Sequence, residues 1–241
     1  MVVRGWRYTL ALTWVREKDK PTEVLDRLWQ QVALSKIACK RVLLDRYFFT
    51  VPVLKWLQER RLPFIVPVVM RGRKPKRGTK AKGLRSCRGW KAGSHAYTHR
   101  AGADSVDFQL VITYKSSRHP RTKKRRTKKL FFAMWKVRLA PAGVREAYRL
   151  RFGIETSYRQ LKGSRSRTSS RDPLYRFLLV GLSLFLRNVW QWLVTEAARR
   201  VPKKCAPGSK PGPWRYRDVL DAFVEHLWRS TQTPNGPIPI S

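Results

Sequence analysis

The sequence predicts an α/β fold whose sheet is interrupted by a β-rich insertion and followed by C-terminal helices. Two observations support this. Strand-like and helix-like patterns alternate between residues 6 and 69, which is typical of sheets with crossover connections. Alternating apolar segments then return at residues 106–114 and 130–138, between strongly basic stretches. With 241 residues, the chain is long enough to bury a substantial core.

The first part of the chain contains three predicted strands and two predicted helices. β-branched, aromatic and aliphatic residues predict a strand over residues 6–15. Lys20, Pro21 and Thr22 open a helical pattern, with proline at a position that a helix tolerates. The remaining elements of this part are a short strand that ends in a carboxylate at residues 41–45, a helix at 53–61 and a strand at 63–69.

The second part is predicted to be helical. Pro141 begins a helix that reaches about Lys162, and Asp172 with Pro173 predicts the N-terminus of an apolar helix that ends near Arg200. Composition therefore divides the chain into four segments. These are a first part of the core (1–70), a β-rich basic insertion (71–138), core helices (139–200), and a linker, short helix and tail (201–241).

The net charge indicates a polyanionic partner. Lys and Arg number 53 against 15 Asp and Glu, which gives a formal net charge of +38. Residues 71–91 and 115–129 concentrate this charge, and we predict exposed loops there that form a phosphate-binding surface. Nucleic acid is favoured over an acidic membrane because phosphate contacts release counterions and supply affinity without sequence reading. Solvated charged loops without a partner are the alternative.

Other features point to a cytoplasmic protein. The three cysteines have no paired spacing, so neither a disulfide framework nor a zinc site is expected. Residues 177–186 are apolar, but Arg176 and Arg187 bound them, and ten residues are too few to span a bilayer. We predict a buried core helix there, no membrane partner, and a cytoplasmic, nucleoid-associated location.

A carboxylate stands among arginines in the segment YRLRFGIETSYRQLKG, residues 148–163. In a continuous helix, Leu150, Ile154 and Leu161 would pack on the sheet, and a polar stripe would lie at its rim. An ordinary surface helix with an Arg–Glu pair is the alternative reading. The predicted polar stripe consists of Tyr148, Arg151, Glu155 and Lys162.

Asp45 follows a predicted strand, and α/β proteins bind ligands and metals at such strand ends. Its alternative role is a helix N-cap. A strand-end Asp together with Glu155 is what a two-metal phosphoryl-transfer site needs, because hard oxygen ligands hold two Mg²⁺ ions about 3.5–4 Å apart.

The spacing Tyr148-x₂-Arg151-x₃-Glu155-x₆-Lys162 resembles the Tyr-Arg-Glu-Lys signature of bacterial and archaeal insertion-sequence transposases of the DDE class. The segment VLLDRYFFTVPVLKWLQERRLPFIVPV is similar to that family's region around its second catalytic Asp. The resemblance covers about residues 4–195. It implies a ribonuclease-H-like core, interrupted by a β-rich insertion that residues 71–138 fit.

The resemblance also implies residue roles. Asp45 and Glu155 would be catalytic carboxylates that bind two Mg²⁺ ions in the complete enzyme. The residues that would contact the DNA end and its phosphates are Tyr148, Arg151, Arg159 and Lys162, of which arginines suit phosphate oxygens bidentately.

The chain departs from the family pattern because no residue before Asp45 takes the place of the first catalytic Asp. Asp19 is predicted in a loop and Asp26 within a helix. We therefore expect an N-terminally truncated transposase that binds Mg²⁺ weakly or not at all, and that binds DNA without cutting or joining it.

The sequence thus favours a transposase or transposase fragment that acts on mobile-element ends and target DNA. In the complete enzyme this means Mg²⁺-dependent hydrolysis and strand transfer. A catalytically inactive DNA-binding remnant is one alternative, and a basic ribonucleoprotein component is another. The expected protein partner is either a second copy on paired DNA ends or a complementing N-terminal fragment.

Overall fold

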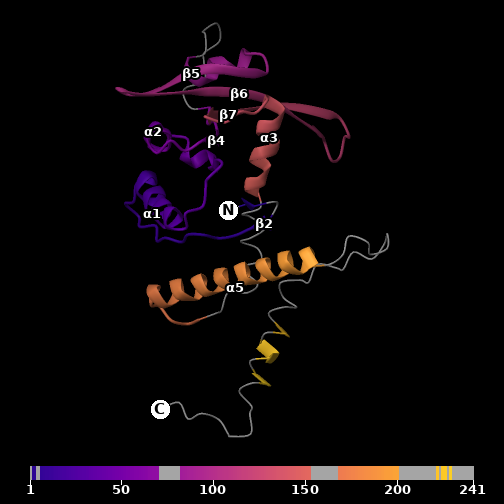
Figure 1. Ribbon diagram of the computed structural model, residues 1–241. Coiled ribbons are helices and arrows are strands. Elements are labelled where there is room, and N and C mark those ends of the chain that lie inside the picture. Colours follow the sequence, from indigo (N-terminus) through magenta and orange to yellow (C-terminus); the bar gives the residue numbers. More distant parts are fainter. Residues whose placement is uncertain are drawn as a thin grey trace. The chain divides into compact units, whose positions relative to one another are not determined.

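The computed structural model describes residues 2–3, 6–70, 82–152, 168–200, 221–222, 224–226 and 228–229. The chain divides into two units (Figure 1). One unit comprises residues 13–152, and the other comprises residues 1–12 and 153–241.

The unit of residues 13–152 is built on a five-stranded sheet with the order β3-β4-β7-β6-β5. β3 and β4 are parallel, and the other neighbours are antiparallel. The strands are β3 (Val42–Leu43), β4 (Phe64–Pro67), β5 (Gly93–Ala101), β6 (Asp104–Arg118) and β7 (Arg125–Trp135). The helices are α1 (Pro21–Leu34), α2 (Val51–Glu59) and α3 (Pro141–Arg149), with 3-10 turns η1 (Arg46–Phe48), η2 (Gly83–Gly89) and η3 (Leu150–Phe152).

The sheet buries both of its faces because successive side chains of a strand point to opposite sides. Phe64 and Val66 of β4 belong to the larger apolar cluster, which includes residues of α1, α2 and η2. Ile65, between them, belongs to the second cluster, which α3 completes with Val144 and Tyr148. Helices thus cover the sheet on two sides (Figure 1).

The structure confirms a mixed α/β architecture. α1 begins at the predicted Pro21, with Lys20 as its N-cap. The expected strands after residue 69 are present as β6 and β7, and they share one sheet with β3 and β4. β5 was not predicted, because its less exposed positions include Gly93, His95 and His99, so the strand lacks a clear apolar face.

The predicted strand over residues 6–15 is wrong for most of its length. Only Trp6–Arg7 (β2) pairs, with Val2–Val3 (β1), and residues 8–15 lie outside any strand. At Thr9, the side-chain amide of Asn188 makes the backbone hydrogen bonds that a neighbouring strand would otherwise make. Its Oδ1 accepts from the Thr9 N–H at 2.9 Å, and its Nδ2 donates to the Thr9 carbonyl at 2.6 Å.

The other unit contains the long helix α5 (Pro173–Arg200). Asp172 caps it as predicted, since its Oδ1 accepts from the Leu174 N–H at 2.9 Å. The prediction that residues 177–186 form a buried core helix is wrong for one face, because Leu178, Leu182 and Phe185 are exposed. The part of α5 from Pro173 to Glu196 has the length and apolar composition to cross a membrane, but core helices of soluble proteins share these properties.

Candidate functional site

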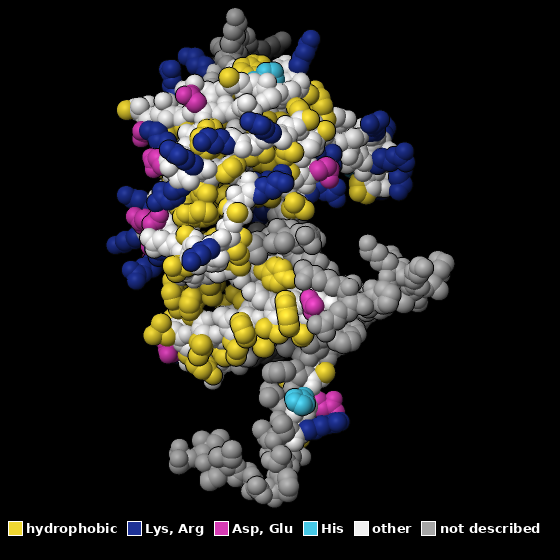
Figure 2. Space-filling model, viewed as in Figure 1, with side chains coloured by type: hydrophobic (Ala, Val, Ile, Leu, Met, Phe, Trp, Pro, Cys, Tyr) yellow, Lys and Arg dark blue, Asp and Glu magenta, His cyan; other side chains and the backbone are white. Residues whose placement is uncertain are grey.

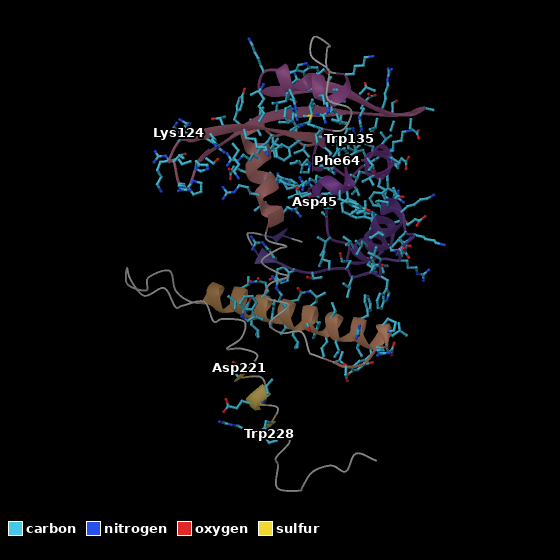
Figure 3. The ribbon with its side chains drawn as sticks, turned by 180° about the vertical axis from the view of Figure 1, so that it is seen from behind. Asp45, Phe64, Lys124, Trp135, Asp221 and Trp228 are labelled. Carbon is cyan, nitrogen blue, oxygen red and sulfur yellow. The ribbon has the colours of Figure 1, made fainter. Side chains whose placement is uncertain are left out.

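The carboxylate of Asp45 lies at the carboxyl end of β3, two residues after Leu43, and it is exposed (Figure 3). Its Oδ1 accepts the backbone N–H of Arg46 at 2.7 Å, so Asp45 is the N-cap of the 3-10 turn η1. Within the described sheet, β3 is an edge strand. Asp45 therefore combines the predicted strand-end position with the capping role that was its alternative reading.

Tyr148 fixes the backbone next to Asp45. Its phenol donates to the carbonyl oxygen of Leu44 at 3.2 Å, and its ring lies against Phe132 of β7, with 5.2 Å between ring centroids. The side chain is 7% exposed. Tyr148 thus ties α3 to the end of β3 immediately before the carboxylate.

This position corrects the predicted orientation of the helix. Tyr148 was expected in a polar row at the rim, and Leu150 against the sheet. Instead Tyr148 packs with Val144 in the core, while Leu150 is 41% exposed. The physical reason is that Tyr148 follows Val144 by four residues in α3, so both side chains lie on the helix face that packs on the sheet. Leu150 lies beyond the end of the α-helix, in the 3-10 turn, where the angular position of the side chains changes.

Of the remaining signature residues, the structure describes Arg151. The Arg151 guanidinium lies over the Tyr148 ring, 5.8 Å from its centroid. Glu155, Arg159 and Lys162 lie outside the described residues. The expected proximity of Glu155 to Asp45 therefore stays a prediction.

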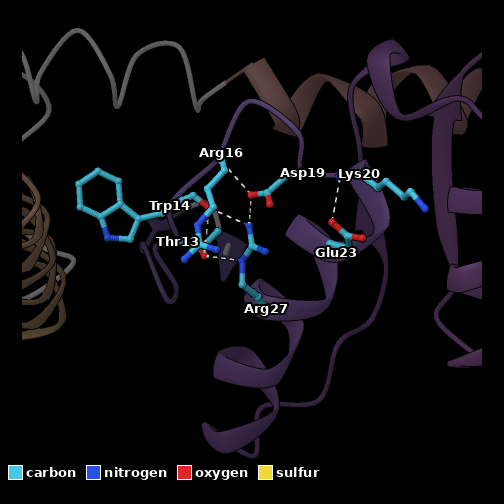
Figure 4. A network of polar contacts seen from close by, with 7 residues as sticks. All are labelled: Thr13, Trp14, Arg16, Asp19, Lys20, Glu23 and Arg27. Atoms are coloured by element: carbon cyan, nitrogen blue, oxygen red, sulfur yellow. Dashed lines mark hydrogen bonds and ion pairs between the residues drawn. The ribbon is translucent and has the colours of Figure 1, made fainter. Parts of the chain in front are cut away.

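Asp19, upstream of Asp45, belongs to a closed polar network at the start of α1 (Figure 4). The Arg16 N–H donates to its Oδ2 at 2.8 Å, and the Arg27 guanidinium pairs with the same oxygen. These two partners, the Arg16 N–H first, lower the pKa of the Asp19 carboxyl below its ordinary value. Arg27 also donates to the Thr13 hydroxyl and the Trp14 carbonyl, so Asp19 anchors the chain that leads into α1.

The second aspartate upstream of Asp45, Asp26, is also engaged within the fold. Its Oδ1 pairs with the Arg60 guanidinium, and its Oδ2 accepts from the Gln30 amide at 3.2 Å. Asp26 links α1 to the end of α2. Both upstream aspartates therefore make structural contacts.

Residues 115–129, which we call the basic hairpin, form the outer ends of β6 and β7 and the turn between them. They were predicted as an exposed loop, and this is wrong for most of the segment, because the β6–β7 ladder continues to the pair Arg118 and Arg125. The exposure was predicted correctly, and Lys124 lies at the free end (Figure 3). Alternation was hard to see in the sequence because both faces of the ribbon are polar. Its nine cations are Lys115, Arg118, Arg121, Lys123, Lys124, Arg125, Arg126, Lys128 and Lys129.

Like charges stand opposite one another in this ladder. Lys115 pairs with Lys128, and Arg118 pairs with Arg125. Such directly opposite like charges destabilise a sheet. Among the described residues, no carboxylate forms an ion pair with the hairpin. In Figure 2, Lys and Arg side chains, drawn in dark blue, crowd the hairpin. The hairpin is therefore a concentrated cationic surface without an internal counter-charge in the described structure.

Lys129, at the inner end of the basic hairpin, and Arg145 of α3 make contacts that support the hairpin. Lys129 Nζ donates to the carbonyls of Arg88 and Trp90, both at 2.8 Å, and so joins β7 to the end of η2. Arg145 of α3 donates to the Tyr114 carbonyl at 3.4 Å. Sequence reasoning missed both, since each contact joins segments far apart in the chain.

A family model described as the transposase DDE domain matches residues 21–189, which is more than half of the chain. The chain belongs to this family. The match includes Asp45, the basic hairpin and the whole Tyr-Arg-Glu-Lys signature. No curated protein matches the chain.

DDE transposases typically use divalent metal ions. In the described part of this transposase domain, no group of three or more His, Cys, Asp or Glu side chains is placed to hold a metal ion. Asp45 offers an exposed carboxylate, and a two-metal site needs several such oxygen ligands. The described residues alone do not supply that donor set.

Proposed function

We propose that the chain functions as an insertion-sequence transposase that binds DNA through its basic surface. In the complete enzyme, the activity would be Mg²⁺-dependent hydrolysis and strand transfer at the ends of a mobile element, on a ribonuclease-H-like core. The observation that carries the proposal is the family match over residues 21–189. The exposed carboxylate at the end of β3 and the cationic hairpin support it.

Charge provides the physical basis for DNA binding. A net charge of +38 on 241 residues favours association with a polyanion. Each phosphate neutralised by Lys or Arg releases counterions, so affinity should fall steeply as salt rises. Sequence-independent binding of this kind would position the chain before any base is read.

The proposed catalytic carboxylates are Asp45 and Glu155, which would hold Mg²⁺ ions. Such ions would supply the activation of the attacking oxygen and the stabilisation of the leaving oxygen. Asp45 would present its carboxylate from the end of β3, with Tyr148 holding the preceding carbonyl. Arg151, Arg159 and Lys162 would bind phosphates at the DNA end.

Two further features belong to the same proposal. The chain would act as a pair of copies on two DNA ends, or together with a complementing N-terminal fragment, and it would reside in the cytoplasm with the nucleoid. Size measurement of the chain with and without DNA tests the first feature.

A gel-shift titration at several salt concentrations tests DNA binding. We expect the logarithm of the association constant to fall linearly with the logarithm of salt. Absence of binding, or affinity insensitive to salt, would overturn the proposal.

Incubation of the chain with supercoiled plasmid and Mg²⁺ tests catalysis. Any nicking should disappear in Asp45→Asn and in Glu155→Gln, and should persist in the control Glu59→Gln, whose exposed side chain lies at the end of α2. Nicking that survives both substitutions would contradict the assigned carboxylates. Salt-sensitive binding without nicking would assign the chain the binding part of transposase function alone.

A further inference from the structure

The basic hairpin differs from an ordinary charged surface because it carries cations on both faces. Directly opposite residues of an antiparallel pair share a face, and faces alternate along a strand. Arg118 and Arg125 therefore lie on one face, where Arg125 Nε also donates to the Ser116 hydroxyl at 2.8 Å. Lys115 and Lys128 lie on the other face.

The hairpin also stands apart from the rest of the sheet. β5 pairs with β6 only from Asp104 to Ile112, so beyond that point β6 and β7 form a two-stranded ribbon. Lys115–Arg118 and Arg125–Lys128 are exposed, and the ribbon projects from the body of its unit (Figures 1 and 2). Anions can therefore approach it from both sides.

We infer that the basic hairpin enters the major groove of duplex DNA, with one phosphate backbone against each of its faces. This inference rests on the proposed DNA-binding function and specifies how the DNA is held. A ribbon that lay flat on one backbone would need cations on a single face. A groove supplies two walls of phosphate, one for each face.

The dimensions favour the major groove. A β-ribbon with its side chains is about 10 Å thick, the spacing of packed sheets. The major groove is about 12 Å wide, whereas the minor groove is about 6 Å wide. Four residues per strand, at about 3.4 Å each, give a ribbon longer than the groove depth of about 8.5 Å.

The turn brings further donors to the end of the ribbon. His119 and Lys124 close it, since the His119 N–H donates to the Lys124 carbonyl at 2.9 Å. Lys123 adopts a left-handed backbone conformation with φ of 55° and donates its N–H to the His119 carbonyl. The end of the ribbon is thereby held in a defined turn that carries cations to the groove floor.

Paired substitutions test the inference. Arg118→Gln with Arg125→Gln removes two charges from one face, and Lys115→Gln with Lys128→Gln removes two from the other. The matched control, Lys18→Gln with Lys36→Gln, removes two exposed charges that flank α1 in the sequence. Each variant and the parent chain are titrated with a mixed-sequence duplex of about 30 base pairs, over a series of salt concentrations.

We expect both face variants to bind more weakly, each by about 10- to 30-fold near physiological salt, with the salt slope reduced by about 2. The control should keep the parent slope. The parent should protect guanine N7, which faces the major groove, from dimethyl sulfate, and both face variants should lose this protection. Thermal unfolding should show that the variants stay folded, because they relieve cross-strand repulsion.

Loss of affinity in one face variant alone would overturn the groove model in favour of contact with a single backbone. Unchanged affinity in both, or protection of adenine N3 in the minor groove instead of guanine N7, would also overturn it. A parent chain that binds no DNA would refute the proposed function itself, and the titration of the parent separates these cases.

Discussion

β6 and β7 run through two regions with opposite physical character. The inner region, residues 106–113 of β6 and 130–134 of β7, lies within the five-stranded sheet and contributes buried side chains to both apolar clusters. The basic hairpin continues the same ladder without interruption, but its side chains are mostly exposed and cationic.

The same antiparallel ladder of β6 and β7 therefore stabilises the fold in one region and presents charge in the other. In the inner region, burial of apolar surface stabilises the fold. In the basic hairpin, opposed like charges cost stability. A segment that lowers stability while concentrating charge is best explained by a partner that neutralises it.

The largest expected effect lies in the inner region. Ile112 is fully buried, and Ile112→Ala should lower the free energy of unfolding by about 2–5 kcal/mol through lost burial and the cavity left behind. Ser117→Ala in the basic hairpin is the control and should change it by less than about 0.5 kcal/mol. Urea denaturation measures both, and equal effects would erase the contrast between the regions.

A smaller effect is expected where α3 joins the inner region to the end of β3. Tyr148→Phe keeps the ring against Phe132 but removes the hydrogen bond to the Leu44 carbonyl. The free energy of unfolding should fall by about 0.5–1.5 kcal/mol. Tyr148→Phe with unchanged stability would show that the phenol does not hold the strand end.

The smallest effect on stability should have the opposite sign. Lys128→Glu places a carboxylate opposite Lys115 and should stabilise the chain by about 0.2–1 kcal/mol, while weakening DNA binding. The control Lys18→Glu lies outside the ladder and should not stabilise it. If Lys128→Glu leaves both the free energy of unfolding and the affinity for DNA unchanged, the proposed conflict between folding and binding is contradicted.

The sequence allowed the prediction of the elements whose signals are local. Proline at the first helical turn marked α1 and α5, and alternation of apolar residues marked the inner part of β6. The strand-end position of Asp45 was also predictable, because it follows from a short apolar run that ends in a carboxylate.

The errors have long-range causes. No local pattern shows that Asn188 takes the backbone bonds of Thr9, 179 positions away, so a strand was predicted there. Helical periodicity grouped Tyr148 with Arg151 and Glu155, but the sheet covers the face that Tyr148 shares with Val144. Leu150 was expected against the sheet because an uninterrupted α-helix was assumed, whereas the helix tightens at Leu150. The predicted roles of Glu155, Arg159 and Lys162 stay predictions, since these residues lie outside the described chain.

Hydrogen exchange of the backbone amides, with and without duplex DNA, tests the central claim most directly. In the free chain, amides of the inner region should exchange slowly, and those of residues 115–128 should exchange fast, because this two-stranded ribbon is exposed. DNA should slow exchange across residues 115–128 and leave the inner region unchanged. Unaltered exchange in the basic hairpin, at DNA concentrations that saturate binding, would contradict the account.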